Sequence, residues 1–264
     1  MAQIDVLVPL RNIPVNSDEL LSIQRNDLVP LLNDQYRLNH YADSVIQAQS
    51  VLLNGVDPQL TLQLSQTIEQ LIQSLADSKK YLKKRKFNGL QKWLGIDIEY
   101  GSTQVEYYKK LDQLLDRANH LSQKLQIEIQ KSQARYQQLT GLREQMAKYV
   151  SAAEAFLMEY PKFVKNAHPL DNFAERLSKK INSLQTLQSS NDIAITQMQL
   201  SQQLSLSLLD RFKEAQQVLI PAWQYHVKQS QQSSSTIELE KLDNSREKLI
   251  RTLKNHYRNQ HFKK

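Results

Sequence analysis

Apolar side chains recur alternately every three and four residues along the middle of the chain, from Tyr108 to Tyr160. This average period of 3.5 residues is typical of helices that pack side by side in a coiled coil. The positions are Tyr108, Leu111, Leu115, Ala118, Ser122, Leu125, Ile129, Ser132, Tyr136, Leu139, Arg143, Met146, Val150, Ala153, Leu157 and Tyr160. We call this set the seam; only its two serines and Arg143 are poor core residues. The pattern predicts a helix roughly 80 Å long, whose apolar stripe needs a partner.

A second amphipathic segment runs from Leu170 toward His226. Proline lacks an amide hydrogen and clashes with the preceding helical turn, so Pro161 and the His168-Pro169 pair are expected to end the first long helix. The two segments are then expected to fold back as an antiparallel hairpin. The apolar positions assigned to the second stripe are Leu177, Ile181, Leu184, Leu187, Leu200, Leu204, Leu208, Phe212, Ala215 and Leu219.

Three features favour interruptions within these segments. Gly141 costs a helix about 1 kcal/mol relative to alanine, so a bend or a hairpin there is an alternative. Residues 189–191 (SSN) are a candidate kink. Pro221 is expected to kink or end the second helix.

Shorter helices are predicted on both sides of the hairpin. Residues 1–16 form an extended strap, Asn16 caps a first helix, and a second helix is expected from Asn26 to Gly55. Asp57 and Pro58 begin the next helix; its stripe is Leu60, Leu64, Ile68, Leu71, Ile72 and Leu75. Breaks are expected around 87–89 and at Gly95 and Gly101. After a linker at 229–235, the last helix carries Ile237, Leu242, Leu249, Leu253 and Tyr257.

The predicted fold class is all-α: an elongated antiparallel helical bundle or coiled-coil hairpin with shorter N-terminal and C-terminal helices. We divide the chain into three parts: residues 1–101 with the strap and short helices, 102–228 with the hairpin, and 229–264 with the linker and a basic helix. A chain of 264 residues is long enough to bury a core. The sequence leaves open whether the seam closes within one chain or in an oligomer.

Composition narrows the function classes. The chain has no cysteine, which excludes disulfides, thiolate nucleophiles and cysteine-ligated zinc. The net charge of +7 favours anionic partners. Neither a signal peptide nor a run of about 20 apolar residues is evident, so we expect a cytoplasmic location, with peripheral attachment to the inner face of the membrane as an alternative.

A basic and aromatic cluster occupies residues 78–95 (SKKYLKKRKFNGLQKWLG). Such a mixture can contact an acidic protein or an anionic membrane surface, or the phosphates of a nucleic acid. The alternative is a solvated basic turn whose apolar side chains close the end of the bundle. The candidate contact residues, to which we add Trp223, are Lys79, Lys80, Tyr81, Lys83, Lys84, Arg85, Lys86, Phe87 and Trp93.

Motifs for catalysis and for cofactors are missing from the sequence. It contains no phosphate-binding glycine loop, no dinucleotide turn and no nucleophile elbow. The histidines are scattered without metal-binding spacing; His120 is expected to be exposed and His226 partly packed. We therefore expect neither a cofactor nor a metal, and no enzymatic activity.

Several segments resemble the TelA-like toxic-anion (tellurite) resistance family of bacteria. The likeness begins at KKRKFNGLQKWLG and continues through YYKKLDQLLDRANHLSQKLQIEIQ. It is most specific at ITQMQLSQQLSLSLLDRFKEAQQVLIPAWQYHV, where a Gln- and Met-rich helix leads to the corner from Ile220 to Trp223, and it closes with LDNSREKLIRTL. The resemblance spans residues 20–258, and the chain lacks the long charged C-terminal extension of many members.

This resemblance implies a role in tolerance of tellurite or of envelope-active stress, without an established catalytic site. Because the chain has no thiol, direct reduction of an oxyanion is not favoured. We expect a scaffold or adaptor that acts through protein contacts. The alternatives are a peripheral membrane-binding protein of the BAR-like kind and, less favoured, a nucleic-acid binder.

Overall fold

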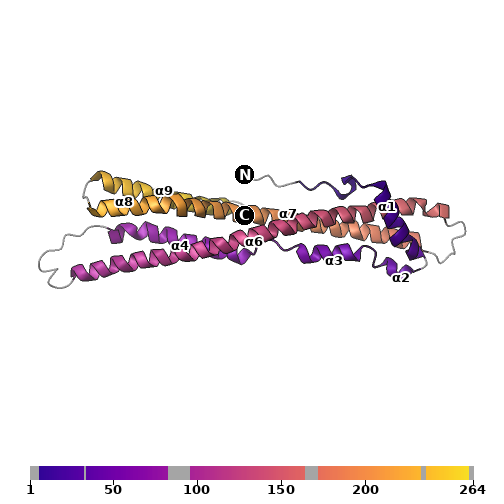
Figure 1. Cartoon of the computed structure of the whole chain (residues 1–264), viewed down its shortest axis with the longest axis horizontal. Coiled ribbons are helices and arrows are strands. Elements are labelled where there is room, and N and C mark those ends of the chain that lie inside the picture. The colour runs from indigo at the N-terminus through magenta and orange to yellow at the C-terminus, as the bar shows by residue number, and fades with distance from the viewer. Residues whose placement is uncertain (1–5, 33, 83–95, 164–171, 233–235, 262–264) are drawn as a thin grey trace. The chain divides into compact units, whose positions relative to one another are not determined.

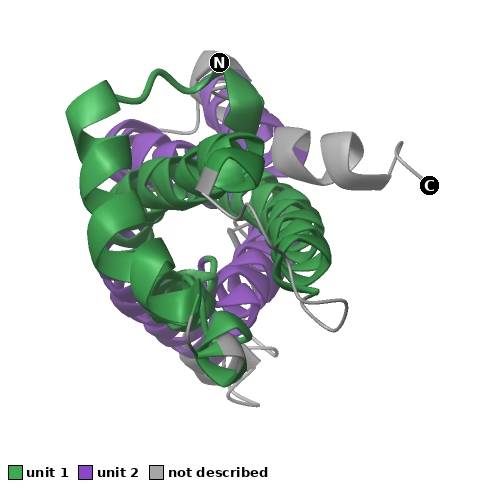
Figure 2. Cartoon of the chain, turned by 90° about the vertical axis from the view of Figure 1, so that its right-hand side faces the viewer, with its two compact units in different colours: residues 1–55, 130–202 green, residues 56–129, 203–264 purple. Residues whose placement is uncertain are grey.

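The structure, a computed structural model, describes residues 6–32, 34–82, 96–163, 172–232 and 236–261. Every regular element among these residues is a helix, which confirms the all-α class (Figure 1). The chain forms two compact units: unit 1 contains residues 1–55 and 130–202, and unit 2 contains residues 56–129 and 203–264 (Figure 2). Each unit combines segments that are distant in sequence, so these units differ from a division in chain order.

The long helix α6 spans Ile96–Phe163, 68 residues. It begins before Gly101 and passes Gly141 without interruption, so the alternative of a hairpin at Gly141 is wrong. A Cβ at Gly141 would meet nothing within 4 Å, which means that no close packing requires this glycine. The expectation that Pro161 ends the helix is also wrong, because the helix continues to Phe163. A proline removes one amide donor, and the buried Tyr160 beside it still holds this turn against the core.

The seam is confirmed over its length. Apolar members are buried or partly buried, and they join the core of unit 2 up to Ile129 and that of unit 1 from Tyr136 onward. Its three polar members are also buried: Ser122, Ser132 and Arg143 are 4%, 0% and 4% exposed. A single chain therefore closes the seam.

The second long helix, α7, spans Phe173–Glu214 and shows no break at 189–191. Its stripe differs from the predicted one, because Leu200 and Leu204 are 46% and 42% exposed. The buried positions from Gln188 to Phe212 are Gln188, Asn191, Ile195, Met198, Gln199, Gln202, Ser205, Leu208, Leu209 and Phe212. They keep the 3.5-residue period of a packed helix, but half of them are polar. The apolar character of the two leucines led the prediction to a neighbouring face.

Near Pro221 the predicted interruption is a short π-helix that precedes the proline. Helix α7 continues into the π-helix η4 (Ala215–Leu219) and then into α8 (Ile220–Gln232). A local change in helical hydrogen bonding is one way to accommodate a residue without an amide donor. Residues 229–232 of the predicted linker belong to α8, and residues 233–235 lie outside the described part of the chain.

The N-terminal part of unit 1 is more divided than predicted. Asn16 caps α1 (Ser17–Ile23), with its side-chain oxygen accepting from the Asp18 amide at 3.0 Å. The expected helix from Asn26 to Gly55 is wrong, since Asp34, with a φ of -137°, and Ala42, with a left-handed φ of 63°, leave the helical conformation. Besides α1, the helical segments of this N-terminal part are η1 (Leu10–Asn12), the π-helix η2 (Gln24–Leu28), η3 (Val29–Leu32), α2 (Gln35–Leu38) and α3 (Asp43–Leu52).

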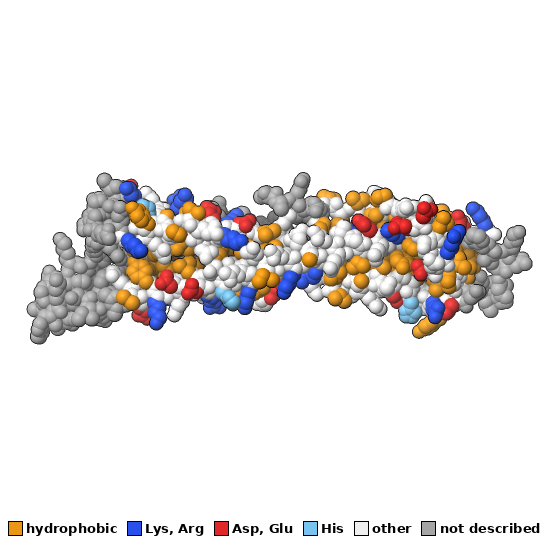
Figure 3. All heavy atoms as spheres, in the orientation of Figure 1, with side chains coloured by type: hydrophobic (Ala, Val, Ile, Leu, Met, Phe, Trp, Pro, Cys, Tyr) orange, Lys and Arg blue, Asp and Glu red, His pale blue; other side chains and the backbone are white. Residues whose placement is uncertain are grey.

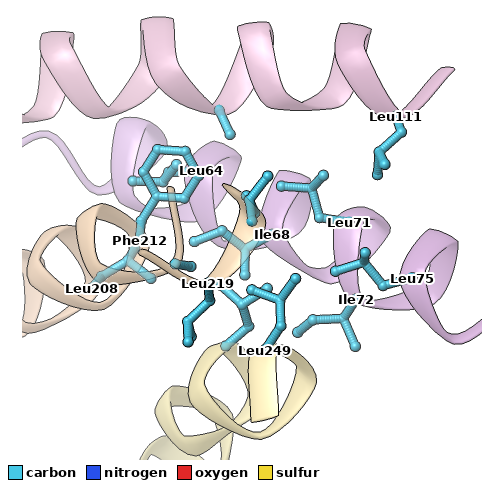
Figure 4. Packing of buried hydrophobic residues seen from close by; sticks show 14 of the residues in the cluster. Leu64, Ile68, Leu71, Ile72, Leu75, Leu111, Leu208, Phe212, Leu219 and Leu249 are labelled. Atoms are coloured by element: carbon cyan, nitrogen blue, oxygen red, sulfur yellow. The ribbon is translucent and has the colours of Figure 1, made fainter. Parts of the chain in front are cut away.

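The core of unit 2 gathers the apolar stripes of several helices (Figure 4). Helix α4 (Pro58–Leu82) begins as predicted, with the Asp57 carboxylate accepting from the Gln59 amide at 2.9 Å. Leu64, Ile68, Leu71 and Leu75 of α4 pack with α6, α7, α8 and α9 (Thr236–His261). Trp223 of α8 lies in this core at 0% exposure. The predicted apolar stripes therefore supply most of the buried residues in the core of unit 2.

Replacement of Trp223 tests this core. We expect Trp223→Ala to lower the free energy of unfolding of unit 2 by about 3–5 kcal/mol, because it leaves a large cavity. Among the described residues the indole N–H has no hydrogen-bond partner, so Trp223→Phe should cost much less. The measurement is urea denaturation followed by far-UV circular dichroism.

Tyr225→Ala serves as the matched control, because this side chain is on the same helix and 60% exposed. Its effect should stay within about 0.5 kcal/mol. Equal losses for Trp223→Ala and Tyr225→Ala would contradict the assignment of Trp223 to the core.

Candidate functional site

The predicted contact cluster lies largely beyond what the structure describes. Residues 79–81 are in the last turn of α4, but their side chains are outside the described part. Lys83, Lys84, Arg85, Lys86, Phe87 and Trp93 all fall within residues 83–95, also outside it. This cluster stays a prediction. Placing Trp223 among the exposed contacts is wrong, because its side chain is wholly buried.

A buried ion pair in unit 1 joins the two long helices. Arg143 of α6 donates from Nε to Asp192 Oδ1 and from Nη2 to Asp192 Oδ2, both at 2.8 Å. Arg143 Nη2 also donates to the backbone oxygen of Val8 in the N-terminal strap. This bidentate geometry is the strong form of an arginine–carboxylate pair. It explains how a guanidinium is tolerated within the seam.

Three amides extend the pair into a network that reaches α3. Gln188 Nε2 donates to Asp192 Oδ1 at 2.7 Å, and Gln49 Nε2 of α3 donates to Gln188 Oε1 at 2.9 Å. Asn191 Nδ2 donates to Gln49 Oε1 at 2.7 Å. Gln49 and Gln188 are 0% and 1% exposed. Because these groups bond one another inside the unit, we read the network as structural.

An open cavity of about 610 Å³ lies elsewhere in unit 1. Its lining comes from the segments between η2 and α3, with Tyr149 added from α6. The ionisable and aromatic members are Asp27, Asp34, Tyr36, Arg37, His40, Tyr41 and Tyr149. We call this the tyrosine cavity.

One wall of the tyrosine cavity is a pair of tyrosines. The Tyr41 hydroxyl donates to the backbone oxygen of Tyr149 at 2.8 Å, and the two rings meet edge to face with centroids 5.3 Å apart. Burial raises the pKa of Tyr41, and Tyr149 and Asp27 raise it further. The pKa of Tyr149 is also raised, by burial, by the charge of Asp27 and by a hydrogen bond to that carboxylate. Both phenols therefore stay neutral at physiological pH.

Tyr36 and His40, which also line the tyrosine cavity, are more exposed than Tyr41 and Tyr149. Tyr36 is 75% exposed, and its ring centroid lies 5.6 Å from that of His40. His40 Nδ1 contacts Asp43 Oδ2 at 2.9 Å, and Lys180 contacts the same carboxylate at 3.0 Å. Burial alone would raise the pKa of Asp43, but the hydrogen bonds from His40 and Lys180 outweigh it and the pKa is lowered.

The described residues form neither a cluster of metal ligands nor a helix that could span a membrane. Within the described ranges, no three His, Asp or Glu side chains come together in a way that could hold a metal ion. Along the described helices, no stretch has the length and hydropathy that crossing a bilayer requires. His120 is exposed and His226 partly buried, as predicted.

Most of the chain is similar to a protein of Escherichia coli. The chain is 29% identical to Protein KlaA of Escherichia coli over 191 residues, which cover 70% of this chain and 72% of KlaA. This similarity agrees with the resemblance to the TelA-like tellurite-resistance family at the family level. No family model matches the chain. No solved structure matches it either.

The buried pair predicts an asymmetric response to mutation. Asp192→Ala leaves the guanidinium of Arg143 buried without its counter-charge, so we expect a loss of about 3–5 kcal/mol in the stability of unit 1. Arg143→Met leaves Asp192 with its bond from Gln188 and 24% side-chain exposure, so the loss should be smaller, about 1–3 kcal/mol. Denaturant titration of the single and double variants measures both losses and their coupling.

The double variant should be more stable than Asp192→Ala alone, because it removes the uncompensated charge. Additive losses, or a greater loss for Arg143→Met than for Asp192→Ala, would contradict the role assigned to the pair.

Proposed function

We propose that this chain is a non-enzymatic helical scaffold or adaptor that acts in tolerance of tellurite or a related toxic anion through protein contacts. The observation that carries the proposal is the similarity to KlaA over 70% of the chain, together with the family-level resemblance. The stretches that carry the family resemblance include parts of α6, α7, α8 and α9.

The arrangement of polar groups supports an adaptor. The seam and the stripe of α7 use their buried arginine, glutamines and asparagine to bond neighbouring helices. Such contacts favour fixed helical surfaces, on which a partner can dock without rearrangement of the core. The basic and aromatic segment 83–95 joins α4 to α6, two helices of the unit 2 core. Its composition resembles that of interface anchors, which are rich in aromatic residues and arginine.

The charge pattern favours a protein partner over a membrane surface. Basic and acidic side chains are interspersed among the described residues on the face shown in Figure 3. An anionic membrane attracts a continuous basic field, whereas alternating charges suit selective contacts between proteins. The membrane alternative therefore depends on the basic segment alone.

Tellurite tolerance tests the proposed role. Expression of the chain in a tellurite-sensitive bacterial host should raise the tellurite concentration that permits growth. Alanine replacement of Lys79, Lys80, Lys83, Lys84, Arg85 and Lys86 should return this concentration to that of the empty vector, because the proposed contact surface loses its charge. No gain in tolerance from the unaltered chain would remove the toxic-anion part of the proposal.

A charge-matched control separates the surface from net charge. Six lysines that are exposed on α6, α8 and α9 offer the same change in charge: Lys109, Lys124, Lys228, Lys241, Lys248 and Lys254. Their replacement by alanine should leave tolerance intact. Equal loss in both six-residue variants would count against a specific contact surface at residues 79–86.

Capture of partners distinguishes an adaptor from a membrane binder. Affinity purification of the tagged chain from soluble and membrane fractions, read by mass spectrometry, should yield proteins that the six-residue cluster variant does not retain. Flotation with anionic and neutral vesicles is the parallel measurement. Salt-sensitive flotation with anionic vesicles alone, without specific proteins, would favour the peripheral membrane function instead.

A further inference from the structure

The tyrosine cavity carries a negative charge that the protein itself does not neutralise. Its lining includes the carboxylates of Asp27 and Asp34 and the guanidinium of Arg37. Arg37 Nε lies 3.4 Å from Asp34 Oδ2, and Asp34 Oδ1 accepts from the Arg37 amide at 3.2 Å. Asp27, by contrast, lies near enough to Tyr149 for its charge to raise the pKa of that phenol, and no cation among the described residues forms an ion pair with it. One carboxylate therefore faces the cavity without a counter-charge.

Aromatic rings line the cavity together with this carboxylate. Tyr41 and Tyr149 form one pair, and Tyr36 and His40 form a second with an interplanar angle of 60°. Ring faces carry partial negative charge, so they attract cations, and aromatic cages are a recurrent way to bind ammonium groups. The volume of about 610 Å³ lies in the range of small-ligand sites.

Anions are disfavoured at the same place. The cavity holds two carboxylates against one guanidinium, and that guanidinium is already paired with Asp34. The Tyr41 hydroxyl donates to the backbone oxygen of Tyr149, so it is not free to donate to an oxyanion. The chemistry of the cavity thus differs from what a tellurite-binding site needs.

We propose that the tyrosine cavity binds an alkylammonium group, with Asp27 as its counter-ion and the rings of Tyr36, Tyr41 and Tyr149 as its walls. The group comes from a small amine or from a lysine side chain of a peptide. This site is separate from the basic segment in the proposed function and does not depend on it.

The test is a titration of the full chain, labelled with ¹³C at the tyrosine ε carbons and followed by NMR. Butylammonium chloride is the probe; 1-butanol and butyrate are the neutral and anionic comparators. We expect butylammonium to shift the resonances of Tyr36 and Tyr149 in a saturable manner and the two comparators to leave them unchanged. Tyrosine-to-phenylalanine variants assign the resonances.

Two substitutions identify the groups that bind. Asp27→Asn removes the charge and retains an oxygen that can accept from the Tyr149 hydroxyl; Tyr36→Leu removes an exposed ring. Each should weaken butylammonium binding about fivefold. Unchanged affinity in Asp27→Asn would overturn the proposal, as would equal shifts with butylammonium and 1-butanol.

Matched controls come from the same chain. Tyr225 forms a similar pair with His226, at 5.5 Å between ring centroids and 69° between planes, and it belongs to unit 2. Tyr225→Leu should not alter binding, and neither should Glu144→Gln, which removes an exposed carboxylate of unit 1. A fivefold loss in either control would show that binding is not specific to the cavity and would overturn the assignment.

The source of the ammonium group is resolved by two further probes, spermidine and the peptide acetyl-Gly-Lys-Gly-amide. Binding of either one that is lost in Asp27→Asn supports the site. Tighter binding of the peptide assigns it to a lysine of a partner, and tighter binding of spermidine assigns it to a small amine. Binding of neither would overturn the proposal.

Discussion

The buried guanidinium of Arg143 links three segments of unit 1, namely α6, α7 and the N-terminal strap. An apolar stripe of leucines and alanines can pack in more than one register along a coiled coil, because successive heptads offer similar surfaces. A buried charge removes this freedom, since it needs its carboxylate at one position only. Asp192 supplies that carboxylate, and Gln188 and Gln49 then fix α3 against α7. The bond from Arg143 to the oxygen of Val8 places the N-terminal strap by the same group.

The positions of the long helices were predicted from the sequence more accurately than the positions of their interruptions. The seam of α6 was found because its period survives three polar members. The stripe of α7 was missed where polarity and burial diverge: Gln202 and Ser205 are inside, while Leu200 and Leu204 are outside. Hydropathy cannot identify a buried glutamine before its partner is known. Pro221 was recognised as an interruption, but the sequence did not predict that the helical path would continue through the π-helix η4 into α8.

The tyrosine cavity could not be predicted from the sequence, for a different reason. Tyr41 and Tyr149 are 108 residues apart, and nothing in their local spacing relates them. The chain between them includes the left-handed backbone of Ala42, next to Tyr41. Non-glycine residues rarely adopt this backbone conformation, so the sequence around Ala42 did not predict it. The basic segment 78–95, by contrast, is conspicuous in composition alone.

Electrostatics separates two kinds of surface on this chain. The whole chain carries a net charge of +7 and concentrates lysines in one segment, yet the lining of the tyrosine cavity includes a carboxylate without an ion pair and several aromatic rings. A cation and an anion cannot share one such site, because the field that attracts the first repels the second. If the chain acts in tolerance of an oxyanion, the cavity is therefore a poor place for that anion to bind. This physical argument favours an indirect role, in which contacts with other molecules, rather than capture of the toxic anion, connect the chain to resistance.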